Sequence, residues 1–432
     1  AACSREPAPP GEAGFLRLID HLAKQNVLTS PLKEHPESSP KEAVYPPDSS
    51  LLQDAGTGEN PFGIKRKCRV GGTARNILFA PPETRLRYDF DRLVGMELEF
   101  GIGILPAGDA GETRPDTARR SGGVSFQVEL DTDRGKEVVF QKYLPLPSRA
   151  EDPVFSWQRI GLPEEAGRVR LSLITRGDRD GFSFWSNPIL LEKKNDVQAV
   201  ILISVDTLRG DHLGCYGYER ETSPHVDTLA AEGVTFLKTY ASSPWTLPSH
   251  VSLLSAFHTV HHQVYREDDA MDPSVVTLAD IMRGEGFYCA GFTGGGFVSS
   301  VYGFSKGFDT YSDDAGSVYR QDAAEHLGRL VKEWLKTHTG KDFFLFLHTY
   351  QPHNPYACPP PYKTLFLGEN PKWRHLDLMS HLGGKPGIFQ RFQTKRRRMS
   401  SGSTTGRSGT RTRDSSEGWW TDSKSSGFMS EP

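Results

Sequence analysis

Residues 198–217 read QAVILISVDTLRGDHLGCYG, and this stretch decides the fold. The segment 198–205 is a continuous run rich in β-branched residues, which is typical of a central parallel strand covered on both faces. The run stops at Asp206. A carboxylate at that point is costly to desolvate unless a cation or hydrogen-bond donors satisfy it. Asp206 is therefore a candidate metal ligand, and capping of the next turn by Asp206 or Thr207 is the alternative.

Strands and helices alternate after this run. The pattern predicts helices at 224–233, 248–256, 277–285 and 324–335, and strands at 234–240, 287–292 and 343–347. Strands that alternate with helices favour a parallel α/β sheet over residues 195–390. In an open α/β sheet, reactive groups gather beyond the carboxyl ends of the strands.

Upstream, residues 63–194 consist of short runs in which apolar and polar residues alternate. Examples are 123–130, 137–143 and 167–175, separated by Gly, Asp and Pro turns. This pattern predicts an antiparallel β-sandwich, jelly-roll-like in character, as an accessory domain. The segment 182–191, with Phe184 and Trp185, resembles the last strand of jelly-roll domains that often bind sugars, and burial of these aromatics in the core is the alternative.

Composition limits the location and the partners of the chain. The net charge of −3 over 432 residues favours no nucleic-acid partner, and no apolar run is long enough for a membrane-spanning helix. Residues 1–62 are typical of a Pro-rich tether, with one helical patch predicted at 15–23. Ala1-Ala2-Cys3 resembles the end of a bacterial lipoprotein signal, so we expect a lipid anchor at Cys3 on the periplasmic or extracellular face of the cell envelope. An arbitrary fragment start is the alternative.

Two further loops carry reactive side chains. Residues 243–250 read SPWTLPSH and stand directly before a predicted helix. The hydroxyl of Thr246 would lie near free N–H donors that favour an anion, and a metal there could make it a nucleophile. An N-cap role for Thr246 is the alternative. Residues 347–356 read LHTYQPHNPY after a predicted strand, and His353 is either a site residue or a solvated loop residue.

Together these segments resemble the N-terminal half of the sulfatase family, in the alkaline-phosphatase-like superfamily, over about residues 198–365. The matching pieces are the DTLRGDHLGCYG segment, TSPHVDTLA at 222–230, the LPS segment of 247–249 and PHNPY at 352–356. The resemblance implies that Asp206 binds a divalent cation, that Thr246 is the nucleophile and also touches the metal, and that His353 lies near the anionic group of the substrate. Calcium is the ion implied by the family, with zinc or manganese as alternatives.

The sequence also departs from the family pattern. Thr246 stands where sulfatases need Cys or Ser for formylglycine, and His250 replaces an arginine, which leaves His250 as a further catalytic candidate. FTGGGF at 292–297 replaces a lysine and a histidine that grip sulfate. We therefore expect a metal-dependent hydrolase of sulfate or phosphate esters, with carbohydrate esters among the candidate substrates. A phosphoryl or phosphoethanolamine transferase with a Thr246 nucleophile and a non-catalytic sugar-binding lipoprotein are the alternatives. His262 fits either a loop or a site role.

The end of the chain does not continue the family pattern. Family members complete the metal site with a later Asp-His or Asp-Asn pair, whereas residues 391–432 are basic and then Ser-rich, as in a disordered tail. The codons of 402–411 can encode a family-like segment in another frame, so we expect an out-of-frame tail after about residue 390. The α/β domain would then be truncated and inactive. The nucleotide sequence decides this point.

Overall fold

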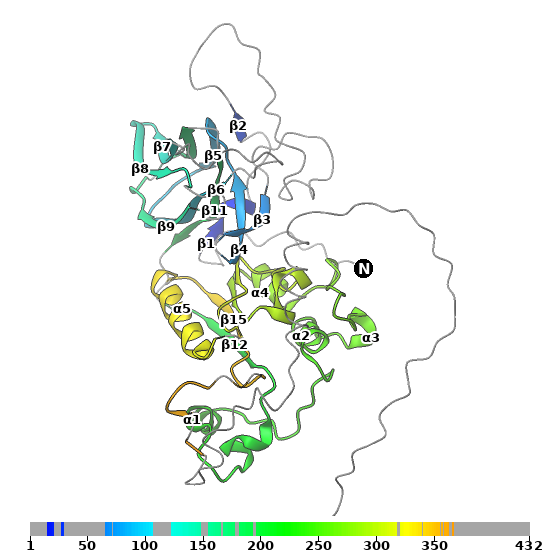
Figure 1. Ribbon diagram of the computed structural model, residues 1–432. Helices are drawn as coiled ribbons and strands as arrows, with labels where there is room; N and C mark the ends of the chain where they lie inside the picture. Colours follow the sequence, from blue (N-terminus) through cyan, green and yellow to red (C-terminus); the bar gives the residue numbers. More distant parts are fainter. Residues whose placement is uncertain are drawn as a thin grey trace, which may run out of the picture.

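The computed structural model describes residues 15–20, 27–29, 65–70, 72–106, 122–147, 154–165, 167–177, 181–192, 196–317, 320–338, 340–354, 356, 358–362 and 365–366. Figure 1 shows a β-rich part next to an α/β part. The predicted lipid anchor at Cys3, most of the tether 1–62 and the tail 391–432 lie outside the described residues. Among the helices described, none is long and apolar enough to cross a membrane.

A five-stranded antiparallel sheet forms one layer of the β-rich part. Its strand order is β2-β5-β10-β7-β8. The strands are β2 (Val27–Thr29), β5 (Thr84–Phe90), β7 (Gly123–Thr132), β8 (Gly135–Pro145) and β10 (Val169–Gly177). The predicted alternating runs therefore do form antiparallel strands, because period-two alternation places one set of side chains on one face.

A ten-stranded sheet runs through both parts of the molecule. Its order is β12-β15-β13-β14-β4-β11-β6-β9, with β1 beside β11 and β3 beside β4. Its strands are β1 (Phe15–Arg17), β3 (Lys65–Val70), β4 (Thr73–Phe79), β6 (Met96–Pro106), β9 (Val154–Gly161), β11 (Gly181–Glu192), β12 (Ala199–Val205), β13 (Tyr288–Phe292), β14 (Thr310–Ser312) and β15 (Phe343–Thr349).

The two parts meet where β14 pairs antiparallel with β4, from Thr310 opposite Arg75 to Ser312 opposite Thr73. On the α/β side of this junction, β12, β15, β13 and β14 are mutually parallel. This is the parallel α/β sheet that the alternation of strands and helices predicts. Hydrogen bonding therefore continues without a break across the predicted domain boundary near residue 194.

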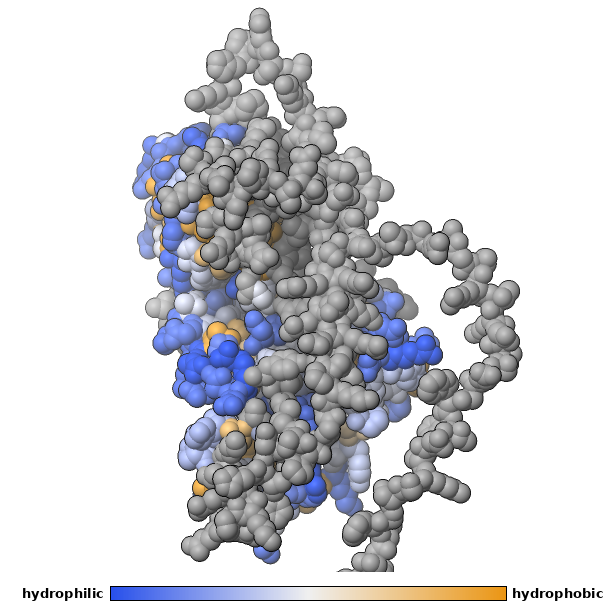
Figure 2. Space-filling view, viewed as in Figure 1, coloured by the Kyte–Doolittle hydropathy of each residue, from blue (hydrophilic) through white to orange (hydrophobic). Residues whose placement is uncertain are grey.

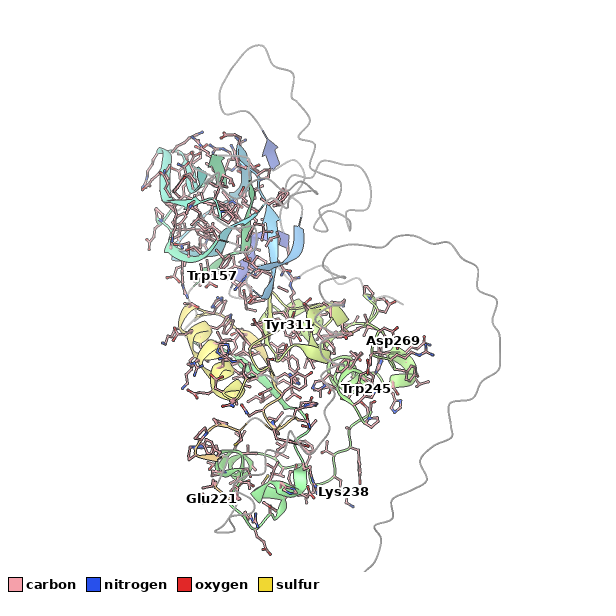
Figure 3. All side chains as sticks on the ribbon, viewed as in Figure 1. Trp157, Glu221, Lys238, Trp245, Asp269 and Tyr311 are labelled. Carbon is pink, nitrogen blue, oxygen red and sulfur yellow. The ribbon has the colours of Figure 1, made fainter. Side chains whose placement is uncertain are left out.

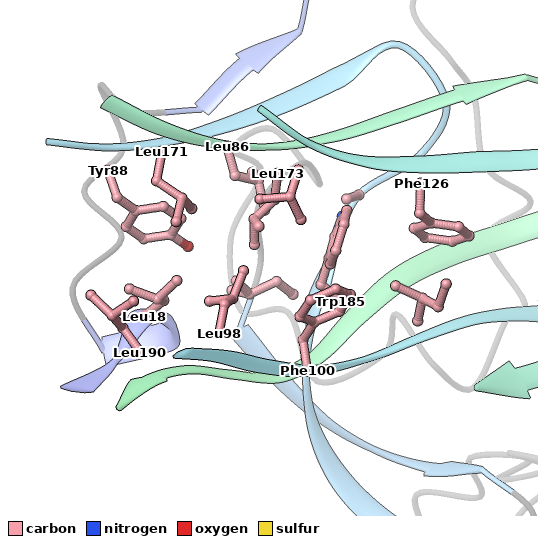
Figure 4. Packing of buried hydrophobic residues seen from close by; sticks show 14 of the residues in the cluster. Leu18, Leu86, Tyr88, Leu98, Phe100, Phe126, Leu171, Leu173, Trp185 and Leu190 are labelled. Atoms are coloured by element: carbon pink, nitrogen blue, oxygen red, sulfur yellow. The ribbon is translucent and has the colours of Figure 1, made fainter. Parts of the chain in front are cut away.

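A hydrophobic core lies between the five-stranded sheet and the β-rich end of the ten-stranded sheet. Figure 4 shows side chains from the two layers meeting, with Leu86 and Phe126 on one side and Phe100 and Trp185 on the other. The Trp185 ring lies within 5.1 Å of Phe100 and 5.4 Å of Phe126, centroid to centroid. Trp185 and Phe184 are both fully buried, so these two aromatics are core residues rather than a sugar-facing surface.

The described helices are α1 (Pro224–Glu232), α2 (Thr246–Ser255), α3 (Thr259–His262), α4 (Leu278–Gly284) and α5 (Ala323–Thr337), with the 3-10 turns η1 (Leu18–Asp20), η3 (Gly210–His212), η4 (Gly214–Tyr216), η5 (Gly296–Val298) and η6 (Ser300–Tyr302). Helices α2, α4 and α5 pack on the sheet of the α/β part, whereas α1 has no buried side chain and lies against η4. α5 buries Leu327, Val331 and Trp334 along one stripe, as its periodicity predicts. The outward face of α5 is charged. Over the visible face of the molecule, most of the coloured residues are blue and therefore hydrophilic (Figure 2).

Two predictions of secondary structure are wrong. The predicted helical patch at 15–23 begins as a strand, because Phe15 pairs with Leu191 in the ten-stranded sheet, and a single 3-10 turn follows. Residues 234–240, predicted as a strand, form no strand, and the side chains of Val234, Phe236 and Leu237 are exposed. Apolar β-branched residues gave the second prediction, but a strand also needs a hydrogen-bonding neighbour, and none of the described strands lies beside this segment.

Within the described part of the chain, β12 is an edge strand, which contradicts the prediction that it is central and covered on both faces. It pairs only with β15 among the described residues. Ile201 and Ile203 are 49% and 59% exposed, and Val200 and Val205 are exposed as well. A run of apolar residues indicates that burial is favourable, but it does not indicate which segment packs against the strand.

Candidate active site

The polar side chains of interest gather at the carboxyl ends of β12, β13 and β15. Asp206 follows the last residue of β12, and its N–H donates to the carbonyl oxygen of Thr349 on β15 at 3.0 Å. Side chains in a strand alternate between faces, so Ser204 and Asp206 share the face that carries Leu202 toward α2. Ser204 lies opposite His348 in the β12–β15 register.

Thr246 and Asp206 meet at this edge. Thr246 is the first residue of α2, and its Oγ1 donates to Oδ2 of Asp206 at 3.1 Å. Both side chains are only 9% exposed. The structure thus brings together the two residues on which the predicted chemistry depends, although their roles as metal ligand and nucleophile stay predictions. Thr246 does not act as an N-cap, because it lies inside the helix and the capping residue is Trp245.

His250 supports the first turn of α2. Its Nδ1 contacts the main-chain oxygen of Thr246 at 2.8 Å and its Nε2 contacts Oγ of Ser204 at 2.9 Å. A carbonyl only accepts, so Nδ1 carries the proton and the neutral ring accepts from Ser204 through Nε2. Burial lowers the pKa of His250, partly offset by the Thr246 carbonyl and by Asp206. The predicted catalytic residue therefore contacts the main chain of Thr246 and makes no hydrogen bond to its hydroxyl.

His348 is a site residue that the sequence analysis did not single out. It is fully buried on β15, and its ring lies 5.0 Å from that of His250 in an edge-to-face arrangement. The N–H of Gly294 donates to Nδ1 at 3.4 Å, so Nε2 carries the proton of the neutral ring. Burial, and then His250 and His353, hold the pKa of His348 well below its usual range. Its Nε2 has no hydrogen-bond partner among the residues that the structure describes.

A signal for His348 was present in the sequence. Side chains two apart along a strand share a face, and Phe344 and Phe346 pack against α2. His348 and Tyr350 continue that series into the site. The hydroxyl of Tyr350 donates to the Gly295 oxygen and accepts from the Phe297 N–H, both at 3.2 Å.

His353 lies at the rim of the same edge. Its ring is 5.4 Å from that of Tyr350, and its Nδ1 donates to the main-chain oxygen of Asn354 at 2.5 Å. The side chain is half-buried, and it forms no hydrogen bond with Thr246 or Asp206 in the described structure. The predicted position near the anionic group of a substrate stays a prediction.

The glycines after β13 bring main chain close to His348 and Tyr350. Gly295 and Gly296 have φ angles of 67° and 57°, in the region that favours glycine. A Cβ on Gly295 would overlap the main-chain oxygen of Asp313. The segment that replaces the family's lysine and histidine is therefore a tight main-chain turn without charged side chains.

The remaining histidine candidate is structural. His262 is buried, with Nε2 3.0 Å from Oγ of Ser252, and its Nδ1 accepts the N–H of Val264 at 3.1 Å. These contacts hold the short α3 against α2. His258, which precedes α3, and His261 are exposed.

The described residues do not form a complete metal site. Across the described ranges, no group of three or more His, Cys, Asp or Glu side chains could hold an ion. Asp206 and Thr246 supply a carboxylate and a hydroxyl, whereas hard divalent cations take about six oxygen ligands. The donor set of the described residues therefore does not fit the ion that the family implies.

Comparison with known proteins identifies the α/β part. The sulfatase family model matches residues 198–391. Arylsulfatase K of Mus musculus is 24% identical over 184 residues, which is 38% of this chain and 33% of that protein. N-acetylgalactosamine-6-O-sulfatase of Bacteroides thetaiotaomicron is 31% identical over 105 residues, which is 22% of this chain and 19% of that protein.

A solved phosphonate monoester hydrolase of Agrobacterium radiobacter is also similar, at 21% identity and a TM-score of 0.33 over 39% of this chain and 43% of that one. This chain spans a third or less of the two sulfatases named above. Taken with the parallel sheet and the matching motifs, the family match shows that residues 198–391 of this chain belong to the sulfatase family.

Proposed function

We propose that this chain carries the nucleophile half of a sulfuric ester hydrolase site, with Thr246 as the attacking residue. The observation that carries the proposal is the hydrogen bond of 3.1 Å from Thr246 Oγ1 to Asp206 Oδ2 at the start of α2. A hydroxyl that already donates to a carboxylate can lose its proton to that carboxylate as it attacks. The named sulfatase relatives support ester hydrolysis as the reaction class.

In this proposal, Oγ1 of Thr246 attacks the sulfur of a sulfate monoester in line with the ester oxygen. The bond from Oγ1 to sulfur forms as the bond to the ester oxygen breaks, and the hydroxyl proton passes to Asp206. We assign delivery of a proton to the departing alcohol to His353, which lies at the partly exposed rim. In the second step a water oxygen bonds to sulfur as the bond from sulfur to Oγ1 breaks; one water proton passes to His353, and the proton held by Asp206 returns to Oγ1 and restores the hydroxyl.

Uncharged donors would hold the sulfuryl oxygens. Nε2–H of His348 is buried without a partner among the described residues and is one such donor. The start of α2 offers main-chain N–H groups, although Pro248 at its third position has none. His250 acts as a positioning residue, since it holds the Thr246 carbonyl at 2.8 Å and Ser204 at 2.9 Å.

The α/β unit of the described residues is, we propose, incomplete. Two observations support this proposal: the exposed side chains of β12, and the small number of oxygen ligands that the described residues offer a cation at Asp206. Turnover by this chain is therefore expected to be low, and labelling of Thr246 in a single turnover is the more sensitive test. A divalent cation would take part only in a completed site, with calcium as the first ion to test and zinc or manganese next.

The test uses the full chain with an aryl sulfate and an aryl phosphate, each with and without the three cations. We expect one sulfuryl or phosphoryl group on the peptide that contains Thr246, located by mass spectrometry, and its loss in Thr246→Val. Thr228→Val is the matched control, because Thr228 is an exposed helical threonine whose hydroxyl donates to the Pro224 oxygen. Equal labelling of Thr246→Val and the native chain would rule out this nucleophile.

The same assay separates the alternative activities. A phosphoryl label that transfers to an added alcohol faster than to water would favour a phosphoryl or phosphoethanolamine transferase. The absence of any label with all cations, together with polysaccharide binding by the chain, would favour a non-catalytic sugar-binding lipoprotein.

We further propose that the β-rich part is a jelly-roll-like accessory domain and that the protein is anchored by lipid at Cys3 in the cell envelope. The alternating sequence of 63–194 and the Ala1-Ala2-Cys3 segment support these two proposals. Incorporation of labelled fatty acid into the native chain and not into Cys3→Ser tests the anchor. Unlabelled native chain in a bacterial host would exclude it.

A further inference from the structure

His338 joins the end of α5 to the β-rich part. It follows the last residue of α5, and its main-chain N–H donates to the Trp334 oxygen at 3.0 Å. Its ring lies 4.4 Å from that of Trp334 on α5 and 5.0 Å from that of Trp157 on β9, and it is inclined by only 13° and 25° to the two indoles. Figure 3 shows Trp157 at the lower end of the β-rich part, toward α5. The imidazole is therefore the middle ring of a stack whose outer rings come from the two parts of the molecule.

The contacts of the His338 ring fit its neutral form. Nδ1 lies 3.0 Å from the Trp334 oxygen, and a carbonyl only accepts, so Nδ1 carries the proton of the neutral ring. Nε2 lies 3.5 Å from Oε1 of Glu99. That carboxylate would attract a second proton to Nε2, but each of its oxygens already accepts from Nζ of Lys341 at 2.7 Å. The Glu99 carboxylate is thus already paired with a buried cation.

Cations dominate the surroundings of this ring. The side chain is only 6% exposed, and burial is the largest of the causes that hold the pKa of His338 well below its usual range. The two indole faces attract a cation, but this effect is smaller than the loss of hydration on burial. The charged and titratable side chains around the ring, among the described residues, are Glu99 on β6, Arg159 on β9 with its partner Glu97 on β6, Arg75 on β4, Tyr288 on β13 and Lys341 before β15.

We propose that His338 is a pH-sensitive switch at the junction of the two parts: the neutral ring holds the end of α5 against β9, and protonation in acid releases it. A charged ring is unfavourable beside Lys341 in a site that water barely reaches, so the stack opens as the proton binds. The pairing of β4 with β14 does not involve this ring, so the opening is local and the two parts stay connected. The proposal does not depend on ester hydrolysis.

The pH range of the switch follows from the direction of the pKa shift. An exposed histidine has a pKa of about 6.5, and the pKa of His338 in the closed state lies below that value. Opening therefore takes up a proton once the pH is below about 6.5. The contribution of the closed stack to stability is complete above about pH 6.5, and it is lost as the pH falls toward the pKa of the closed state.

The test measures backbone hydrogen exchange of the full chain by mass spectrometry, between about pH 5 and pH 7.5, with rates corrected for the intrinsic effect of pH on exchange. In peptides that cover 330–338 and β9, we expect protection to fall below about pH 6.5, by up to about tenfold per pH unit, because one proton is taken up on opening. Protection of β4 and β14 should not follow this change. In His338→Gln, protection at 330–338 should not depend on pH.

His326→Gln is the matched control, since His326 is a half-buried histidine near the start of the same helix. It should show the pH dependence of the native chain. The criterion is the slope with pH, so a general loss of protection in His338→Gln does not affect the comparison. Trp157→Leu keeps His338 and removes one wall of the stack, so the fall in protection should begin at a higher pH. Protection at 330–338 that is independent of pH in the native chain, an equal slope in His338→Gln, or an unshifted onset in Trp157→Leu would overturn the proposal.

Discussion

The ion pair between Lys341 and Glu99 offers the sharpest test of how the two parts are held together. Lys341 precedes β15, Glu99 lies on β6, and both side chains are 0% exposed. In Lys341→Met, the described neighbours left to the Glu99 carboxylate would be Arg159 at 3.9 Å and His338 at 3.5 Å. Breaking a buried pair on one side costs about 3–5 kcal/mol, so we expect a loss of that size in the free energy of unfolding.

The double variant Glu99→Met with Lys341→Met should recover most of this loss, because no buried charge is then left alone. Equilibrium unfolding of the full chain in urea measures both. Lys336→Met is the control, since Lys336 pairs with Glu333 at 2.6 Å on the exposed face of α5, and a change within about 0.5 kcal/mol is expected. A loss below about 1 kcal/mol in Lys341→Met, or losses in the double variant as large as the sum of both single variants, would refute this reasoning.

Three further outcomes are expected. Gly295→Ala should destabilise the chain by about 1–3 kcal/mol, because the new Cβ meets a main-chain oxygen. Gly95→Ala is the control: it has a similar φ of 65° with open space around it, so it should lose less stability when the two variants are compared by urea unfolding. Burial acts to raise the pKa of Asp309, but Arg17 outweighs it and the pKa is lowered. The ionised Asp309 carboxylate should therefore stabilise the fold fully above about pH 4, and this contribution should be lost as the pH falls through the folded pKa. The urea concentration at the unfolding midpoint should show this loss in the native chain and not in Asp309→Asn. Ile203→Thr should change the unfolding free energy by about 0.5 kcal/mol or less and raise solubility in sedimentation assays, because Ile203 is 59% exposed; a large loss would mean that β12 is covered.

The contact between Asp206 and Thr246 could be anticipated because both signals are local. An apolar run that ends in a carboxylate and a hydroxyl placed before a helix each mark a carboxyl edge of a parallel sheet, where such ends converge. His348 was missed although its position two residues after Phe346 on β15 gave its face. A single histidine inside an apolar strand is interpreted as a buried core residue unless its neighbours on the adjacent strands are known.

The failures at 15–23 and at β12 have a different cause, because they depend on distant segments. Phe15 forms a strand because Leu191 is available to pair with it, and Arg17 reaches Asp309 across 292 positions of sequence. The apolar run of β12 correctly indicated a strand of a parallel sheet. Its place at the edge depends on which strands lie beside it, and local periodicity carries no such information.

The ladder between β4 and β14 also limits how the molecule can move and be divided. A hinge between the β-rich and α/β parts would have to break the main-chain hydrogen bonds between β4 and β14, so we expect the two parts to keep their relative orientation. A fragment that starts at residue 195 would present two open sheet edges, at β14 and at β12. Open edges recruit strands from other molecules, and we therefore expect such a fragment to precipitate where the full chain stays in solution.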